Sequence, residues 1–163
     1  MKYMGMNIVN IIIEMKDETD NDFIHILKEK FPLFNVKMFS KDFNGIIGQA
    51  YLDDIYTNDD EEYEKILGEI YIENKLINFS KIYPNKIIGY IEMDCHGGLC
   101  LYEGFVVKNG ELIFRQEYKN NGHIDILKRI NINYEGPFFE PFTRTFLNEN
   151  GYGKDTEIFK ERG

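Results

Sequence analysis

The spacing of apolar side chains along the chain predicts a strand, then a helix, then mostly strands. Residues 6–15 form a short run rich in Ile and Val, which is typical of a strand buried on both faces. From residue 20 to residue 30 the apolar positions recur every three or four residues, which predicts a helix that ends before Pro32. The chain is therefore expected to open with a strand followed by a helix.

Turn-forming residues divide the next part of the chain. Residues 36–39 and 46–52 have the pattern of two strands joined at Asn44-Gly45, a dipeptide that favours a tight hairpin because both residues tolerate positive φ. A second helix is expected to begin near Asn58, because the spacing from this residue to Glu61 is that of a capping box and an apolar stripe follows.

The C-terminal half of the chain is dominated by strand patterns. Residues 75–118 alternate between short apolar stretches and turn sequences, residues 124–130 indicate a short helix, and Pro141 is expected to open a helical turn. The sequence therefore predicts one α+β domain over residues 1–163. It should have a mainly antiparallel sheet, a β-meander in the C-terminal half, and two or three helices packed on the sheet.

Two predicted turns fix the register of this meander. A two-residue turn at Gly97-Gly98 places Cys95 opposite Cys100, and a second turn at Asn109-Gly110 follows the same logic. Because side chains alternate along a strand, one face is expected to be apolar, with gaps at two glycines. That face should carry Met93, Cys95, Cys100, Tyr102, Val106 and Ile113, with the gaps at Gly89 and Gly104.

The sequence "DCHGGLC" around the first turn invites several interpretations of its cysteines. A reduced pair that packs as two small apolar residues is favoured, because a cytoplasmic chain keeps its thiols reduced. A disulfide is geometrically possible, and a metal site or a catalytic thiol is the third alternative. Zinc is disfavoured because it needs about four ligands and His96 is directed to the opposite face.

The opposite face of the meander carries the candidate chemistry. It should hold Tyr90, Glu92, Asp94, His96, Leu101, Glu103, Phe105, Phe114, Gln116 and Tyr118. Two carboxylates, Glu92 and Glu103, then face each other directly, which costs up to roughly 1 kcal/mol relative to a neutral pair. One interpretation is a site made of Glu92, Asp94, His96 and Glu103. Such a site suits a basic side chain, a divalent ion or acid–base chemistry. The other interpretation is a solvent-exposed face whose two glutamates point into water.

Charge is distributed unevenly along the chain. The net charge is −9, and residues 1–80 hold 8 Lys and Arg against 16 Asp and Glu. Such a field repels nucleic acids and anionic membranes and favours a basic partner. The apolar run at the N-terminus is broken by Asn7 and Asn10 and closed by Glu14, and no other run reaches the ~18 residues of a membrane helix. A cytoplasmic protein is expected, with no nucleic-acid or membrane partner.

The acidic excess is concentrated in residues 53–64, which contain seven carboxylates and no basic residue. Acids in the first turn of a helix are favoured by its dipole, which is the simpler explanation. Alternatively, the stretch binds a basic protein, with aromatic anchors and carboxylates that steer the encounter. The binding residues would then be Asp53, Asp54, Tyr56, Asp59, Asp60, Glu62 and Tyr63.

The chain resembles, in type rather than by motif, the small acidic immunity proteins that bacteria encode beside polymorphic or contact-dependent toxins. The resemblance rests on the meander "IIGYIEMDCHGGLCLYEGFVVKNGEL", the segment "PFFEPFTRTFL" and the acidic "DDIYTNDDEEYE". It implies a cytoplasmic inhibitor without catalysis or cofactor that neutralises a cognate basic toxin, and many such toxins are nucleases. The rival expectation is a small enzyme or metal-dependent protein that uses the meander carboxylates. An inhibitor needs an open acidic surface, whereas an enzyme needs a concave pocket with a perturbed carboxylate.

Overall fold

The computed structural model describes residues 6–14, 21–39, 44–51, 61–96 and 99–134. In chain order the elements are β1 (Met6–Glu14), α1 (Asn21–Lys30), β2 (Asn35–Phe39), β3 (Gly45–Tyr51), α3 (Glu61–Ile82), β4 (Ile87–His96), β5 (Leu99–Lys108), β6 (Glu111–Lys119) and α4 (Gly122–Arg129). Among these residues no helix is both long enough and apolar enough to cross a lipid bilayer.

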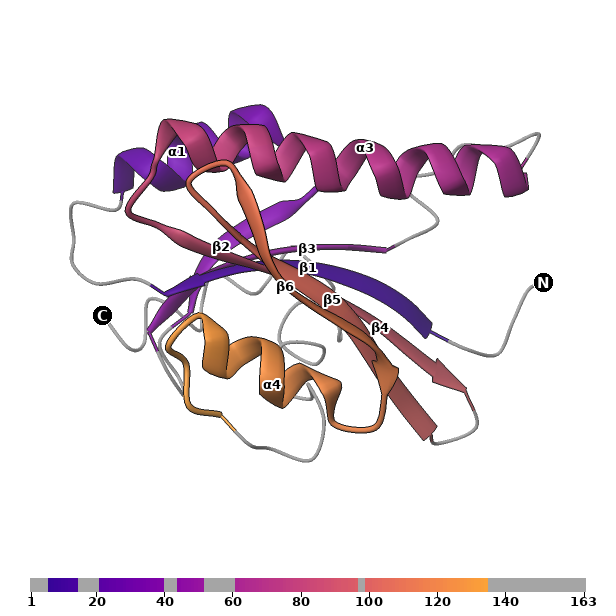
Figure 1. The fold of residues 1–163 in the computed structure, drawn as a ribbon. Helices are drawn as coiled ribbons and strands as arrows, with labels where there is room; N and C mark the ends of the chain where they lie inside the picture. The colour runs from indigo at the N-terminus through magenta and orange to yellow at the C-terminus, as the bar shows by residue number, and fades with distance from the viewer. Residues whose placement is uncertain (1–5, 15–20, 40–43, 52–60, 97–98, 135–163) are drawn as a thin grey trace.

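The six strands form one antiparallel sheet in the order β2-β3-β1-β4-β5-β6 (Figure 1). This arrangement confirms the α+β class and the C-terminal β-meander, which is β4-β5-β6. Strand β1 lies in the middle of the sheet and is buried on both faces, as its run rich in Ile and Val predicts. Ile8 and Ile12 pack on one side, and Ile11 and Ile13 pack on the other.

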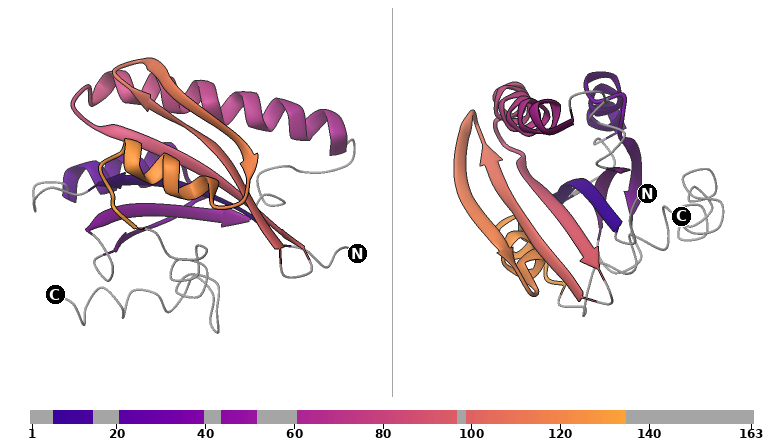
Figure 2. Two further views of the ribbon diagram at one scale, coloured as in Figure 1. Left: turned by 60° about the horizontal axis from the view of Figure 1, so that its bottom comes forward. Right: turned by 90° about the vertical axis from the view of Figure 1, so that its right-hand side faces the viewer.

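Helices cover both faces of the sheet. Figure 1 and Figure 2 show α1 and α3 on one face and α4 on the opposite face, beneath the meander. The first core lies under α1 and α3 and includes Phe23, Leu27, Leu76 and Phe79. The second core lies under α4 and includes Met93, Tyr102, Ile126, Leu127 and Ile130. The two faces of the meander therefore serve two separate cores.

The expected gaps on the second face are filled by α4. A Cβ atom at Gly89 would lie 3.1 Å from the Cδ1 atom of Ile130, and one at Gly104 would lie 3.0 Å from the Cδ1 atom of Ile126. A Cβ at Gly104 would also collide with the backbone carbonyl of Tyr90 on β4. Both glycines therefore allow the helix to seat closely on the strands.

Two boundaries differ from the sequence-based expectation. Residues 75–82 were expected to be strand, but α3 continues to Ile82 because Ile72, Leu76 and Phe79 have helical spacing and bury their side chains against the sheet. Strands β2 and β3 do form an antiparallel pair, but Gly45 pairs with Phe39, so the connection spans residues 40–44 rather than two residues. The helices at 20–30 and 124–130 are confirmed. The segment around Pro141 lies outside the described residues.

Candidate functional site

The strand register of the meander is the one that its turns predict. Glu92 pairs with Glu103, Cys95 pairs with Cys100, and Lys108 pairs with Glu111. His96 pairs with Leu99 across the first turn, whose two glycines lie outside the described residues. The carboxylate pair is therefore a feature of the observed β4–β5 ladder.

The cysteines form a disulfide, so the favoured expectation of a reduced pair is wrong for this structure. Their sulfur atoms are 1.99 Å apart, and their Cα atoms are 4.0 Å apart because the two residues face each other in the ladder. Cys95 and Cys100 pack with the core under α4, on the opposite side of the sheet from the carboxylates. The disulfide closes the end of the hairpin and does not line the carboxylate site.

Glu92 is buried, with only 3% of its surface exposed, so a face with both glutamates in water is ruled out. Its Oε2 atom accepts a hydrogen bond of 2.6 Å from the hydroxyl of Tyr118 on β6. A buried carboxylate is costly unless hydrogen bonds compensate it, and a bond to a charged acceptor is stronger than a neutral one. Tyr118 is therefore part of what holds Glu92 in place.

Several carboxylates act on the same tyrosine. Burial raises the pKa of Tyr118 far above its ordinary value, and the negative charges of Glu92, Glu103 and Asp94 raise it further. Tyr118 therefore stays protonated and remains a hydrogen-bond donor at all ordinary pH values. The structure brings together three of the four residues expected at this site. The side chain of the fourth, His96, lies outside the described residues.

Two bulges in β6 change which of its residues face the carboxylates. Phe114 and Gln116 were expected on the same face of the sheet as Glu92. The register shifts between Val106 and Val107, however, and Phe114 pairs with Val106 on the α4 side. Ile113, expected on the apolar face, is the extra residue of this bulge and is 45% exposed. A second shift near Gly104 returns Tyr118 to the carboxylate side.

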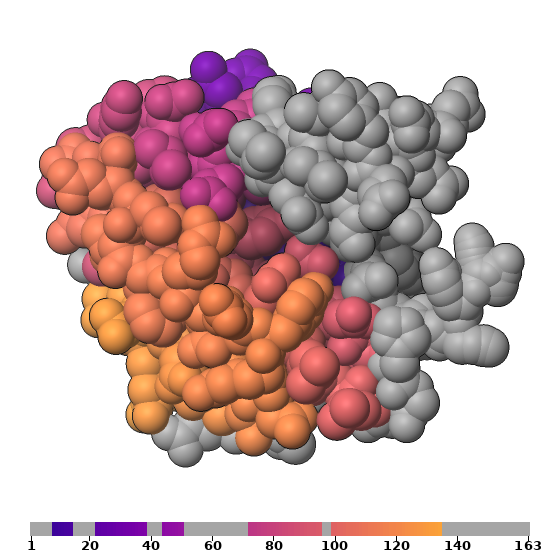
Figure 3. Space-filling view, turned by 45° about the vertical axis from the view of Figure 1, so that its right-hand side comes forward, coloured from indigo at the N-terminus to yellow at the C-terminus, as the bar shows by residue number. Residues whose placement is uncertain are grey.

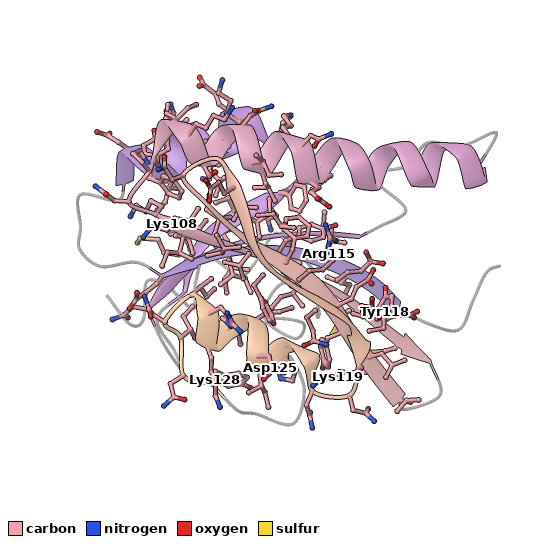
Figure 4. The ribbon with its side chains drawn as sticks, in the orientation of Figure 1. Lys108, Arg115, Tyr118, Lys119, Asp125 and Lys128 are labelled. Atoms are coloured by element: carbon pink, nitrogen blue, oxygen red, sulfur yellow. A yellow bond between two sulfur atoms is a disulfide. The ribbon has the colours of Figure 1, made fainter. Side chains whose placement is uncertain are left out.

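The shifted register places Arg115 at the site. Arg115 pairs with Phe105 in the ladder, and its guanidinium lies 5.7 Å from the centre of that ring. The Nη2 atom of Arg115 also donates a hydrogen bond of 2.8 Å to the Oε2 atom of Glu73 on α3. Figure 4 labels Arg115 and Tyr118 along β6, and Lys119 beside Asp125 of α4, where an ion pair of 3.2 Å forms.

These residues surround a partly open cavity of about 200 Å³ between α3 and the meander. Figure 3 shows the surface recessed between α3 and β6. Tyr90 and Phe105 stack in the cavity wall with their ring centres 4.8 Å apart. Among the described residues, four carboxylates and one guanidinium line the cavity, and this balance of charge favours a cation. The lining residues are Glu73, Tyr90, Glu92, Glu103, Gly104, Phe105, Arg115, Gln116 and Glu117.

Three charged lining residues were missed by the sequence-based prediction. Arg115 and Glu117 were not expected at the site, because strict alternation along β6 places Phe114, Gln116 and Tyr118 on the carboxylate face instead. The three consecutive apolar residues 112–114 break that alternation and were the available signal of a bulge. Glu73 comes from α3, and nothing in the local pattern indicates which strands this helix crosses.

The other candidate chemistry is not placed by the structure. Asp53, Asp54, Tyr56, Asp59 and Asp60 lie outside the described residues. Glu62 and Tyr63 belong to α3, but their side chains are likewise outside the description. Within the described ranges, no three His, Cys, Asp or Glu side chains are grouped so that they could hold a metal ion.

Comparisons of the chain with protein-family models, with curated proteins and with solved structures found no match.

Proposed function

We propose that this protein binds a basic protein partner and receives one lysine or arginine side chain of that partner in the cavity between α3 and the meander. The observation that carries this proposal is the buried carboxylate of Glu92, placed directly opposite Glu103 at a cavity that is open to solvent on one side. Two facing carboxylates repel each other. A cationic side chain between them would turn this repulsion into attraction.

The wall of the cavity suits the rest of a basic side chain. Lysine and arginine carry apolar stems that pack on apolar surfaces while the charged group reaches a polar partner. The stacked rings of Tyr90 and Phe105 offer such a surface next to the carboxylates.

The size of the cavity favours one side chain over a free small molecule. Sites for drug-sized ligands and cofactors usually enclose about 300–1,000 Å³, and this cavity has about 200 Å³. Protein interfaces, in contrast, commonly depend on single anchor side chains inserted into small pockets. A basic anchor residue on a protein surface fits both the volume and the charge.

The physiological role we infer is that of an immunity-type inhibitor that neutralises a basic toxin in the cytoplasm. The whole-chain charge of −9 would speed encounter with a basic protein through electrostatic steering. The acidic stretch of residues 53–64 would add to this field, with the carboxylate cavity as the anchoring point. Inhibition would require binding alone, with no turnover.

A small enzyme is the second candidate, and one observation favours it. A buried carboxylate bonded to a tyrosine at 2.6 Å, beside a second carboxylate in a concave site, has the composition of an acid–base pair. The small volume of the cavity argues against it, because most of a substrate would remain outside. An inhibitor would bind the basic side chain and leave it chemically unchanged, whereas an enzyme would convert it into a product.

The proposal is tested by titrating the isotope-labelled protein with N-acetyl-lysine methylamide, while amide shifts are followed by NMR. The norleucine derivative, which has no charge, is the ligand control. The variant Glu92→Gln/Glu103→Gln should weaken binding by about tenfold or more. The variant Glu29→Gln/Glu111→Gln changes the charge equally at exposed residues that do not line the cavity, and it should bind like the parent. Equal binding by both variants, or equal binding of norleucine, contradicts the proposal.

A parallel capture experiment addresses the partner. The tagged protein and its Glu92→Gln/Glu103→Gln variant are used side by side to purify partners from the source cell. A basic protein retained by the parent and lost from the variant is the expected result. A partner that the two retain equally would show that binding does not depend on the cavity.

A further inference from the structure

Strand β6 is an edge of the sheet, and it is the longer of the two edges. It has nine residues, whereas β2 at the other edge has five. Most of its residues are exposed. Among the described parts of the chain, no element lies beyond β6 in the plane of the sheet, as the right-hand view of Figure 2 shows. Within the described residues its outer edge pairs with no strand, although the backbone carbonyl of Glu117 accepts a hydrogen bond from the side chain of Gln116.

The usual protections of a sheet edge are incomplete on β6. Charged side chains commonly guard an edge, but Arg115 is bonded to Glu73 on one face and Lys119 to Asp125 on the other. Three large apolar side chains are exposed on this strand, namely Leu112 at 39%, Ile113 at 45% and Tyr118 at 37%. The two bulges limit regular pairing to the stretch between them, residues 114–116.

That regular stretch borders the cavity. Arg115, Gln116 and Glu117 are consecutive residues of β6, and all three line it. A strand added outside β6 would place alternate side chains on the same face as Arg115. Neighbouring strands are about 4.8 Å apart, so the added strand would lie roughly 10 Å from β5. A long basic side chain could meet the side chain of Glu103 across this gap.

We propose that the partner presents its basic side chain from an extended segment that pairs antiparallel with β6 and becomes a seventh strand of the sheet. This inference rests on the proposed function, because it describes how the partner would bind at the proposed cavity. The backbone bonds along residues 114–116 would contribute affinity, and the cavity would select the basic residue, which is the division of roles found when strands are added to sheet edges. The occupant is an extended segment with a basic residue at its centre, because four carboxylates of the described residues line the cavity beside the edge.

The test uses a synthetic peptide as the probe. An acetylated and amidated heptapeptide with a central lysine, flanked by alternating threonine and valine, is titrated into the labelled protein. Two further versions carry N-methyl groups on alternate residues, one on the odd set and one on the even set. Because the N–H groups of a strand point alternately to its two edges, only one of the two versions should lose binding. The amide shifts should fall on residues 111–119.

The outcomes separate this inference from the proposed function. Replacing the central lysine by norleucine, or using the Glu92→Gln/Glu103→Gln variant, should weaken binding by about tenfold. If one N-methylated peptide fails but lysine has no advantage, strand addition stands and the cation site fails. If lysine is preferred but both N-methylated peptides bind equally, the cation site stands and strand addition is wrong.

Two further results would overturn the inference. No shift in β6 with any peptide contradicts strand addition directly. Shifts in β6 that depend on protein concentration without peptide would identify a second copy of the chain as the occupant of the edge.

Discussion

The two faces of the meander each pack a core, but they differ in the polar groups that they carry. On β4, Met93 and Cys95 are buried in the apolar core under α4. Glu92 and Asp94 alternate with them along the strand and point to the other face. The α4 face excludes water and is closed by a disulfide. The α3 face keeps like charges around a partly open cavity. Both faces therefore pack a core, and what sets the α3 face apart is the pair of facing carboxylates, which packing alone does not explain.

The largest expected effect comes from damaging the α4 face. Ile126→Ala removes a fully buried side chain that packs over Gly104, and it should lower the free energy of unfolding by about 2–5 kcal/mol. Chemical denaturation measures this loss. Leu33→Ala, at an exposed position, is the control and should change stability by roughly 0.5 kcal/mol or less. Lysine binding by the folded fraction of Ile126→Ala should be unchanged, and its loss would show that the two faces are coupled.

Reduction of the disulfide is expected to have the next largest effect. The bond joins residues only five apart in sequence, and the chain-entropy account of so short a loop gives a stabilisation of about 2 kcal/mol. Denaturation with and without a phosphine reductant measures it. Because the cysteines lie on the α4 face, the affinity for N-acetyl-lysine methylamide should stay within about twofold. A tenfold weakening on reduction would argue against separate roles for the two faces.

A smaller effect is expected for Tyr118→Phe, which removes the hydrogen bond to Glu92. The free energy of unfolding should fall by about 1.5 kcal/mol near neutral pH, because the lost hydrogen bond has a charged acceptor. The pKa of Tyr118 is raised in the folded protein, so the contribution of this hydroxyl is complete below the ordinary tyrosine value of 10.0 and declines as the pH rises above it. The difference in stability between parent and variant should therefore shrink above about pH 10.

The same variant permits a spectroscopic check of the tyrosine. Ultraviolet absorbance reports phenolate formation, and Tyr118 should add nothing to the titration of the folded protein near its ordinary value of 10.0. The parent and Tyr118→Phe should give equal phenolate signals in that range. A larger signal from the parent would mean that Tyr118 ionises normally and that the carboxylates do not surround it as described.

The sequence was sufficient to predict what depends on local pattern. The turn expected at Gly97-Gly98 and the alternation along β4 and β5 predicted the facing pair Glu92 and Glu103, and the apolar run of β1 predicted a strand buried on both faces. Local pattern could not reveal the burial of Glu92, nor the packing of α3 over the meander, which brings Glu73 to the cavity. It also failed at β6, where the bulge at Ile113 reverses the faces of Phe114 and Arg115. The redox state of the cysteines depends on the surroundings as well as on the register.

The most direct test of the account is the free energy of unfolding of Glu92→Gln/Glu103→Gln, measured together with its affinity for N-acetyl-lysine methylamide. The glutamine amide oxygen can still accept the hydrogen bond from Tyr118, while the repulsion between facing carboxylates is removed. The account predicts a protein that is more stable by up to about 1 kcal/mol and that binds the lysine derivative about tenfold more weakly. A variant that is less stable and binds as tightly as the parent would contradict it, because the carboxylates would then support the fold and not a ligand.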